Sequence, residues 1–211
     1  MYLIKTPWWL KKIYPSFVWN MPREEKYIYL TFDDGPHETA TAFVLDELRK
    51  FNAKATFFCI GKNVQKHPNI YQSIIDEGHA VGNHTFNHMN GWKNNDFIYI
   101  KNISVAAQFI KSNLFRPPYG RIKKAQANML LDQSTNGNQP PQIIMWDVLS
   151  GDFDTKLSPE KCLKNVVRNT TNGSIIVFHD STKAWERMSF ALPKVLEHFS
   201  KQGYRFEAIA Q

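Results

Sequence analysis

The feature that most constrains this sequence is an alternation of strand-like and helix-like segments from residue 26 to residue 208. Short β-branched and aromatic runs predict strands, and apolar residues at helical spacing predict helices between them. The predicted strands are 27–32, 55–60, 80–83, 114–116, 142–148, 174–178 and 204–208. This alternation predicts an α/β fold with a parallel sheet covered by helices, either an open doubly wound sheet or a barrel.

The helical segments are expected at 44–51, 70–77, 97–110, 122–129, 158–167 and 192–199. Ser158 and Pro159 predict the cap and first turn of the fifth helix, and Pro193 is expected near the start of the last. The polar stretch 132–141 is predicted to be a loop. Because no Gly-rich phosphate loop follows the first strand, the sequence argues against a nucleotide-binding fold.

Composition narrows the class of protein further. A chain of 211 residues with 43% hydrophobic and 21% charged residues fits one globular domain, not a disordered chain. Apolar runs of only four or five residues exclude a transmembrane helix. Cys59 and Cys162 are too few for a disulfide scaffold and are expected to be inert thiols. The net charge of +7 favours an anionic partner, but the scattered Lys and Arg form no basic helix for nucleic acid.

The N-terminal segment differs in composition from the rest of the chain. Residues 1–19 are rich in Trp, Tyr, Phe and Lys but have neither the apolar stretch nor the cleavage site of a secretory signal. We expect residues 1–25 to be an extension packed on the domain formed by 26–211, with contact to a membrane surface as the less favoured alternative. With no signal visible, a cytoplasmic location is the default expectation.

Polar side chains gather where the predicted strands end. Asp33 and Asp34 follow the first strand, His84 and His88 the third, Arg116 the fourth, Asp147 and Asp152 the fifth, and His179 and Asp180 the sixth. Each group also has an interpretation without a functional role, such as a turn, a surface arginine or a core histidine. Since (β/α) barrels build their active sites at the carboxyl ends of the strands, the joint placement predicts an active site there.

The groups that follow the first and third strands suggest a metal site. Two adjacent carboxylates repel each other unless a cation lies nearby. His84 and His88 are four residues apart, a spacing that places two imidazoles on one side of a helical turn. With Asp34 as third ligand, the set would leave an open position for water, as in catalytic zinc sites; cobalt and nickel are alternatives to zinc.

The other groups suggest acid–base chemistry. The forked guanidinium of Arg116, fixed by the following Pro117-Pro118, suits holding Asp33 ionised and oriented. His179 emerges from an apolar strand, where burial would lower its pKa. A partner such as Asp152 would raise that pKa again and leave an acid usable near neutrality.

These motifs resemble those of the NodB-homology polysaccharide deacetylases, carbohydrate esterase family 4. The resemblance runs from about residue 26 to 208 in five motifs and a second-strand segment. They are Thr31-Phe32-Asp33-Asp34-Gly35, His84-Thr85-Phe86-Asn87-His88, Arg116-Pro117-Pro118-Tyr119-Gly120, Trp146 to Asp152, Val177-Phe178-His179 and, in the second strand, Ala55-Thr56-Phe57-Phe58. It implies a distorted (β/α)7 barrel and metal-dependent deacetylation of a glycan.

The resemblance also implies a role for each motif residue. Asp33 would be the general base, Arg116 its tether, and Asp152 the partner that orients the general acid His179. Asp34, His84 and His88 would hold the metal. The backbone N–H of Tyr119 would bind the oxyanion, and Trp146 and Val177 would line the pocket for the acetyl methyl group. Two positions depart from the family pattern: Phe153 replaces a Trp, and Val177 replaces a Leu.

The function expected from this set is N-deacetylation of GlcNAc-containing glycans, in peptidoglycan or chitin-like oligosaccharides. The alternatives are O-deacetylation of a polysaccharide such as acetylated xylan, and a non-catalytic carbohydrate-binding domain. The presence of Asp33, Asp34, His84 and His88 argues against the non-catalytic alternative.

Overall fold

The computed structural model describes residues 2–132 and 141–210, so most of the loop expected at 132–141 lies outside the described residues. Nine strands in these residues form one sheet. The strands are β1 Phe17–Val18, β2 Tyr27–Asp33, β3 Ala55–Cys59, β4 Ala80–Asn83, β5 Leu114–Phe115, β6 Gln142–Ile144, β7 Val148–Leu149, β8 Ile175–His179 and β9 Arg205–Phe206. Eight of them follow the order β1-β6-β5-β4-β3-β2-β8-β7, and β9 pairs separately with β2.

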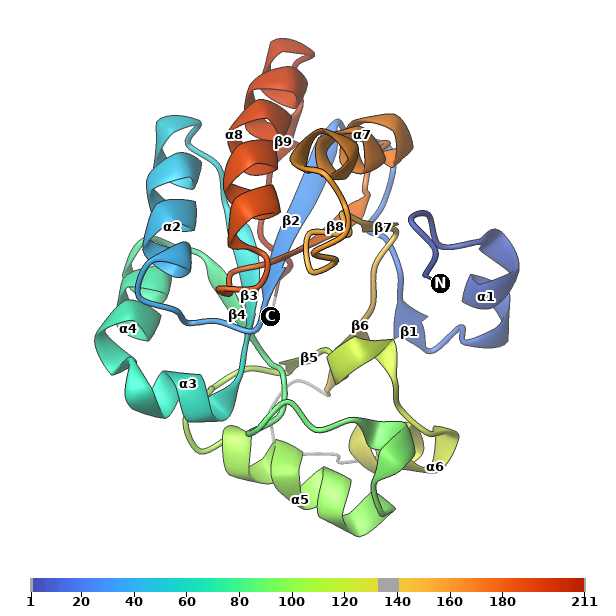
Figure 1. Cartoon of the computed structure of the whole chain (residues 1–211). Helices are drawn as coiled ribbons and strands as arrows, with labels where there is room; N and C mark the ends of the chain where they lie inside the picture. Colours follow the sequence, from blue (N-terminus) through green and yellow to red (C-terminus); the bar gives the residue numbers. More distant parts are fainter. Residues whose placement is uncertain (1, 133–140, 211) are drawn as a thin grey trace.

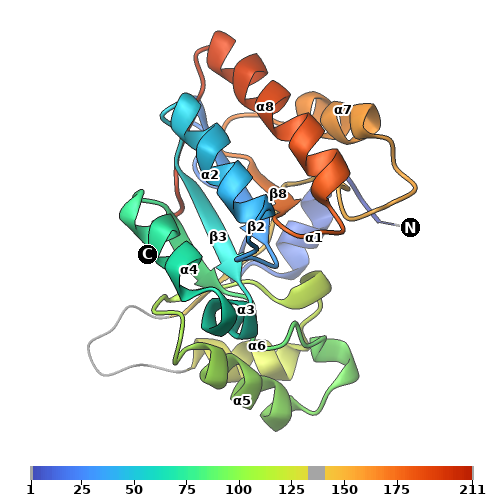
Figure 2. The same ribbon diagram turned by 60° about the vertical axis from the view of Figure 1, so that its left-hand side comes forward.

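The paired strands are parallel, and the helices lie outside the sheet (Figures 1 and 2). The helices are α1 Trp8–Ile13, α2 Ala40–Lys50, α3 Gly61–Lys66, α4 Pro68–Asp76, α5 Asp96–Ala106, α6 Lys124–Leu131, α7 Pro159–Asn169 and α8 Trp185–Lys201. Two 3-10 turns occupy Gly91–Lys93 and Pro118–Gly120. No helix in the described ranges is both long and apolar enough to cross a membrane. The predicted fold class, a single α/β domain with a distorted barrel, is confirmed.

Two parts of the strand prediction were wrong. The segment expected as one strand at 142–148 divides into β6 and β7, which lie far apart in the strand order. It divides because the chain changes neighbours: the N–H of Met145 donates to the carbonyl of Val18 in β1, but that of Asp147 donates to the carbonyl of Ile175, the first residue of β8. In addition, β1 comes from the N-terminal segment, where no strand was expected.

The last helix also differs from its prediction. It begins at Trp185, so Pro193 lies in its interior rather than near its start. Proline inside a helix removes a hydrogen bond and disfavours that conformation. Here the helix buries one face against the sheet, including Met188, Leu192 and Val195. The free energy gained by burying that face offsets the cost of placing Pro193 inside the helix. Helix propensity read from the sequence does not include this tertiary packing.

The alternation of side chains along β2 positions the site. Ile28, Leu30 and Phe32 point outward into the apolar cluster beneath the outer helices. Because successive residues of a strand face opposite sides, Thr31 and Asp33 face the inside of the curled sheet. The inner apolar cluster, which includes Phe58, Ile144 and Ile175, forms the floor beneath them.

Candidate active site

The residues expected at the site come from the carboxyl ends of five strands of the sheet. Asp33 ends β2 and lies opposite His179, which ends β8. His84 directly follows β4, Arg116 directly follows β5, and Asp152 follows β7 by three residues. The parallel order of the sheet therefore places them at one edge, as the pattern of polar residues predicted.

Asp34, His84 and His88 form a cluster suited to a metal ion. One donor atom from each residue lies within 4.8 Å of the others. Oδ1 of Asp34 is 3.1 Å from Nε2 of His88 and 3.8 Å from Nε2 of His84. This oxygen is buried and accepts no hydrogen bond from the described residues. A buried acceptor without a donor, facing two imidazole nitrogens, fits a divalent cation such as zinc.

The backbone that carries the two histidines is a loop, so the prediction that they share a helical turn was wrong. Thr85 and His88 adopt positive φ angles of 65° and 59°, which a right-handed helix excludes. Side-chain acceptors hold the loop: Oδ1 of Asn83 accepts the N–H of Thr85, and Oγ1 of Thr85 accepts that of Met89. The loop brings the two imidazole centroids to 5.1 Å from each other.

Neighbouring groups orient both imidazoles toward Asp34. Nδ1 of His84 lies 2.8 Å from the carbonyl oxygen of Arg116, to which it donates, so Nε2 is left as an acceptor. Nδ1 of His88 lies 3.1 Å from the hydroxyl of Tyr119. Burial lowers the pKa of His84 to about 4, and the ring is therefore neutral at pH 7, as a metal ligand must be. Burial alone would raise the pKa of Asp34, but the surrounding histidines hold it well below its usual value.

Asp33 is held by a buried arginine. Nη1 of Arg116 donates to Oδ1 of Asp33 at 2.8 Å, and the Arg116 side chain is fully buried. The guanidinium also lies 4.0 Å from the ring centroid of Phe58. Its planar, fixed guanidinium sets the orientation of the Asp33 carboxylate.

His179 and Asp152 form a second close pair. The Asp152 carboxylate accepts both Nδ1–H and the backbone N–H of His179, each at 2.7 Å. Burial alone would lower the pKa of His179, but the charge and hydrogen bond of Asp152 raise it above its usual value. The bond at Nδ1 leaves Nε2 available to donate a proton.

The three residues expected to contact substrate lie around these pairs. Tyr119 has φ of 61° and a side chain that is 61% exposed. The ring of Trp146 packs beside Gly120, where an added Cβ would lie 2.6 Å from it. Val177 is buried in β8, two residues before His179 and therefore on the same face of the sheet.

Backbone strain is concentrated at this edge of the sheet. Five non-glycine residues have positive φ in the described ranges, and four of them are Asp34, Thr85, His88 and Tyr119. Such conformations cost free energy and persist where the surrounding structure fixes them.

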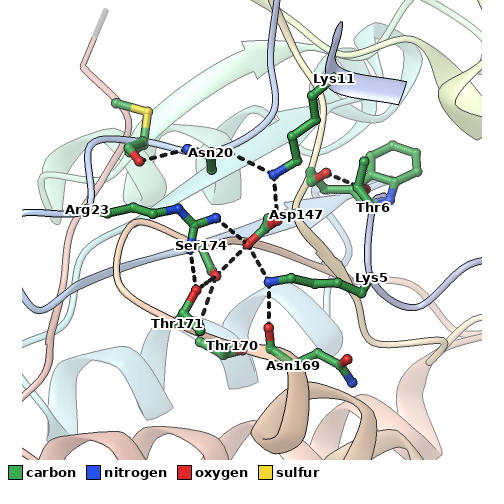
Figure 3. Close-up of polar contacts among 12 residues, drawn as sticks. Lys5, Thr6, Lys11, Asn20, Arg23, Asp147, Asn169, Thr170, Thr171 and Ser174 are labelled. Atoms are coloured by element: carbon green, nitrogen blue, oxygen red, sulfur yellow. Dashed lines mark hydrogen bonds and ion pairs between the residues drawn. The ribbon is translucent and has the colours of Figure 1, made fainter. Parts of the chain in front are cut away.

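Asp147, which was grouped with the residues at this edge, does not belong to the site. Its carboxylate is fully buried and binds Lys5, Lys11 and Arg23 from the N-terminal segment (Figure 3). Asp147 lies in the segment that connects β6 to β7, and its carboxylate forms ion pairs with these three cations instead of facing the site. Strand periodicity could not show this, because the cations come from another part of the chain.

The sequence prediction gave no specific role to three residues near the site, although it grouped Asp180 with the polar residues at the strand ends and noted Phe153 as a departure from the family pattern. Thr31 accepts a hydrogen bond from Arg116 at 2.6 Å, and its position two residues before Asp33 was a usable signal. The ring of Phe153 lies 5.3 Å from that of His179. Asp180 accepts the N–H of Gly35 and the hydroxyl of Thr41, which ties the turn containing Asp34 to the end of β8. The contacts of Phe153 and Asp180 depend on the packing of separate segments and have no local sequence signal.

A curled parallel sheet that carries an Asp–Arg pair, a His–Asp pair and a two-histidine, one-carboxylate cluster at one edge defines a hydrolytic enzyme. The sequence profile described as polysaccharide deacetylase matches residues 20–135. The chain belongs to the polysaccharide deacetylase family, as the motifs predicted, and the predicted enzyme class is confirmed with it.

Two curated relatives and one solved structure are similar to this chain over most of their own length. A peptidoglycan-N-acetylglucosamine deacetylase of Bacillus cereus is 35% identical over 92% of this chain and 91% of its own. A chitooligosaccharide deacetylase of Azorhizobium caulinodans is 33% identical over 76% of this chain and 77% of its own. The crystal structure of the Bc1960 peptidoglycan N-acetylglucosamine deacetylase superposes with a TM-score of 0.82 at 31% identity, covering 97% of this chain and 95% of its own.

Proposed function

We propose that this chain is a metal-dependent deacetylase of N-acetylglucosamine in peptidoglycan or chitin-like glycans. The observation that carries the proposal is the convergence of the Asp34–His84–His88 cluster with the Asp33–Arg116 and His179–Asp152 pairs. The names of the relatives support the substrate class.

The cluster supplies the ligands. Asp34, His84 and His88 would hold the cation, with zinc expected before cobalt or nickel. The chemistry such an ion supplies when bound is Lewis acidity, which polarises the acetyl carbonyl and makes a water molecule more acidic.

The residues of the chain then carry the protons. Asp33, oriented by its hydrogen bond from Arg116, accepts a proton from the attacking water. The backbone N–H of Tyr119 donates to the oxygen that gains negative charge at the former carbonyl. Nε2 of His179 donates its proton to the departing sugar nitrogen as the C–N bond breaks, and acetate and the free amine result. Trp146 and Val177 enclose the acetyl methyl group.

The strength of the His179–Asp152 pair favours an amide over an ester substrate. A sugar nitrogen leaves only when it is protonated, whereas a sugar alkoxide, which is a much weaker base than an amide anion, depends less on a general acid. Because Asp152 raises the pKa of His179, the imidazole is protonated at neutral pH and can act as the acid. This favours N-deacetylation over the O-deacetylation alternative.

The test is acetate release from four substrates: N-acetylglucosamine oligomers, peptidoglycan, acetylated xylan and an aryl acetate. Each reaction is run after EDTA treatment and again after zinc or cobalt is restored. Metal-dependent release from the first or second substrate is the expected result. Release from xylan alone would assign the O-acetyl alternative. No release from any glycan, with metal bound, would contradict the proposed function.

A further inference from the structure

The first described residues of the chain, 2–6, lie alongside residues 146–154, and we call residues 2–6 the N-terminal strap. Two backbone hydrogen bonds join them, Leu149 N–H to Ile4 C=O at 2.8 Å and Thr6 N–H to Asp147 C=O at 2.9 Å. The hydroxyl of Thr6 also donates to the carbonyl of Trp146 at 2.7 Å. The strap therefore contacts the segment that carries Trp146, Asp152 and Phe153.

Ion pairs to the buried carboxylate of Asp147 hold the strap in place (Figure 3). Nζ of Lys5 lies 2.7 Å from the Asp147 carboxylate and also donates to the carbonyl of Asn169 at 2.6 Å. Lys11 and Arg23 bind the same carboxylate at 2.7 and 3.1 Å. Because the carboxylate is fully buried, these contacts are less screened than surface ion pairs.

Tyr2, at the beginning of the strap, extends this contact toward the site. Its hydroxyl donates to Oδ2 of Asp154 at 2.9 Å, and its ring centroid lies 5.0 Å from that of Phe153. The Phe153 ring in turn meets the His179 ring edge-on, with centroids 5.3 Å apart. A continuous series of contacts thus runs from Tyr2 through Phe153 to the imidazole that would act as acid.

We propose that Tyr2 is a positioning residue that holds Phe153 against His179 and so fixes the direction of the donating nitrogen. Asp152 binds the imidazole through Nδ1, and one hydrogen bond restrains the tilt of a ring less than its position. Phe153 restricts the tilt, and Tyr2 restricts the movement of Phe153 by packing against its ring. This inference rests on the proposed function, since it assigns His179 as the proton donor.

The proposal predicts an effect that depends on the leaving group. A misdirected imidazole slows proton transfer to a sugar nitrogen, which cannot leave unprotonated. The same change has little effect on an aryl acetate, whose leaving group needs no proton. Loss of the Tyr2 ring is expected to lower kcat on N-acetyl glycans about tenfold with KM unchanged, since small displacements of a reacting group cost this much or more.

Three variants test the proposal in the full chain. Tyr2→Ala removes both the ring and the hydroxyl, whereas Tyr2→Phe keeps the ring on Phe153 and loses only the bond to Asp154. Leu3→Ala is the matched control, because Leu3 belongs to the same strap but its side chain is 55% exposed. Thermal unfolding of each variant shows whether the fold is intact.

The expected result is a loss of kcat on glycan but not on aryl acetate in Tyr2→Ala, with most of the rate kept in Tyr2→Phe and all of it in Leu3→Ala. Equal losses on both substrates, or no loss in Tyr2→Ala, would overturn the proposal. NMR of the ¹⁵N-labelled imidazoles gives a readout independent of turnover. His179 signals that shift in Tyr2→Ala but not in Leu3→Ala support the positioning role even if the wild type releases no acetate, and unshifted signals overturn it.

Discussion

At the scale of single residues, Arg116 ties together the strands that form the site. Its side chain is fully buried and donates to Thr31 and Asp33 on β2. It also donates to the carbonyls of Ile144 and Met145 at 3.1 and 2.9 Å. A planar guanidinium can make these bonds at once, whereas a lysine ammonium cannot match their directions. The orientation of the Asp33 carboxylate therefore depends on packing across three strands.

Replacing Asp33 by Asn tests its role as base. Asn keeps an oxygen that can accept from Arg116 but cannot take a proton from water, so we expect kcat to fall by about 10²- to 10⁴-fold. Acetate release measures the rate, and calorimetric titration with zinc measures metal affinity. The affinity for zinc should be unchanged in Asp33→Asn and lost in Asp34→Asn. Loss of zinc binding in both variants would show that the roles of the two carboxylates are assigned wrongly.

Asp147 makes the stability of the protein depend on pH. Burial alone would raise its pKa, but hydrogen bonds from Lys11, Lys5 and Ser174 hold the pKa at about 2. Since the folded-state pKa lies below the unfolded value, this stabilisation is present above about pH 4 and is lost as pH falls toward 2.

We therefore expect Asp147→Asn to lower the free energy of unfolding at pH 7 by about 2 kcal/mol, or Tm by about 4–8 °C. The difference from wild type should narrow between about pH 4 and pH 2 in urea titrations. Asp46→Asn is the control, because Asp46 is 62% exposed in its pair with Arg49. If the difference in free energy of unfolding between Asp147→Asn and wild type stays constant down to pH 2, ionisation of the Asp147 carboxylate is not its cause.

At the scale of elements, side-chain oxygens decide where several segments begin and end. The loop from His84 to His88, here called the histidine loop, is held by hydrogen bonds to the side chains of Asn83 and Thr85. Helix α7 begins where Oγ of Ser158 accepts the N–H of Lys161 at 3.3 Å. The cap of α7 was predicted because Ser before Pro is a local signal. The histidine loop was not predicted, because its positive φ angles depend on contacts with α5 through Asn102 as well.

The cap of α7 can be tested by Ser158→Ala. Loss of the acceptor leaves an N–H of the first turn unpaired and should lower stability by about 1 kcal/mol, or Tm by about 2–4 °C. Ser104→Ala is the matched control: this exposed serine inside α5 donates to the carbonyl of Ile100, and alanine favours the helix at least as well. Thermal unfolding by circular dichroism should separate the two variants, and an equal change in both would argue against the cap.

At the scale of the whole molecule, the N-terminal segment completes the sheet. Strand β1 pairs with β6 at one end of the strand order, while Lys5 pairs with Val148 in β7 at the other end. The segment from residue 5 to 18 therefore contacts both ends of the curled sheet (Figure 1). We infer that residues 1–25 fold and unfold together with residues 26–211.

Two tryptophans of the N-terminal segment test this inference. Trp19 is 7% exposed in the apolar cluster beneath α5 and α6, so Trp19→Ala should cost about 3–5 kcal/mol. Trp8 is 68% exposed, and Trp8→Ala should change stability by less than about 0.5 kcal/mol. Urea unfolding followed by fluorescence and by circular dichroism should give one coincident transition in each variant. Separate transitions would show that the N-terminal segment unfolds on its own.

Local patterns in the sequence determined the order of the strands and helices along the chain, the parallel sheet, and the polar residues at the strand ends. These follow from alternation and spacing over a few residues, as in β2, where period two places Thr31 and Asp33 on the inner face. Motif resemblance supplied the family.

Tertiary structure alone decided which of these residues meet. Asp147 and Asp152 were both assigned to the end of the same predicted strand, yet Asp147 binds Lys5 and Asp152 binds His179. The contact of Lys5 with Asp147 and the contact of Tyr2 with Phe153 bring together segments more than 140 residues apart in the chain. The physical reason is that hydrogen bonds and burial between distant segments outweigh local propensity, and a single sequence carries no signal of such pairings.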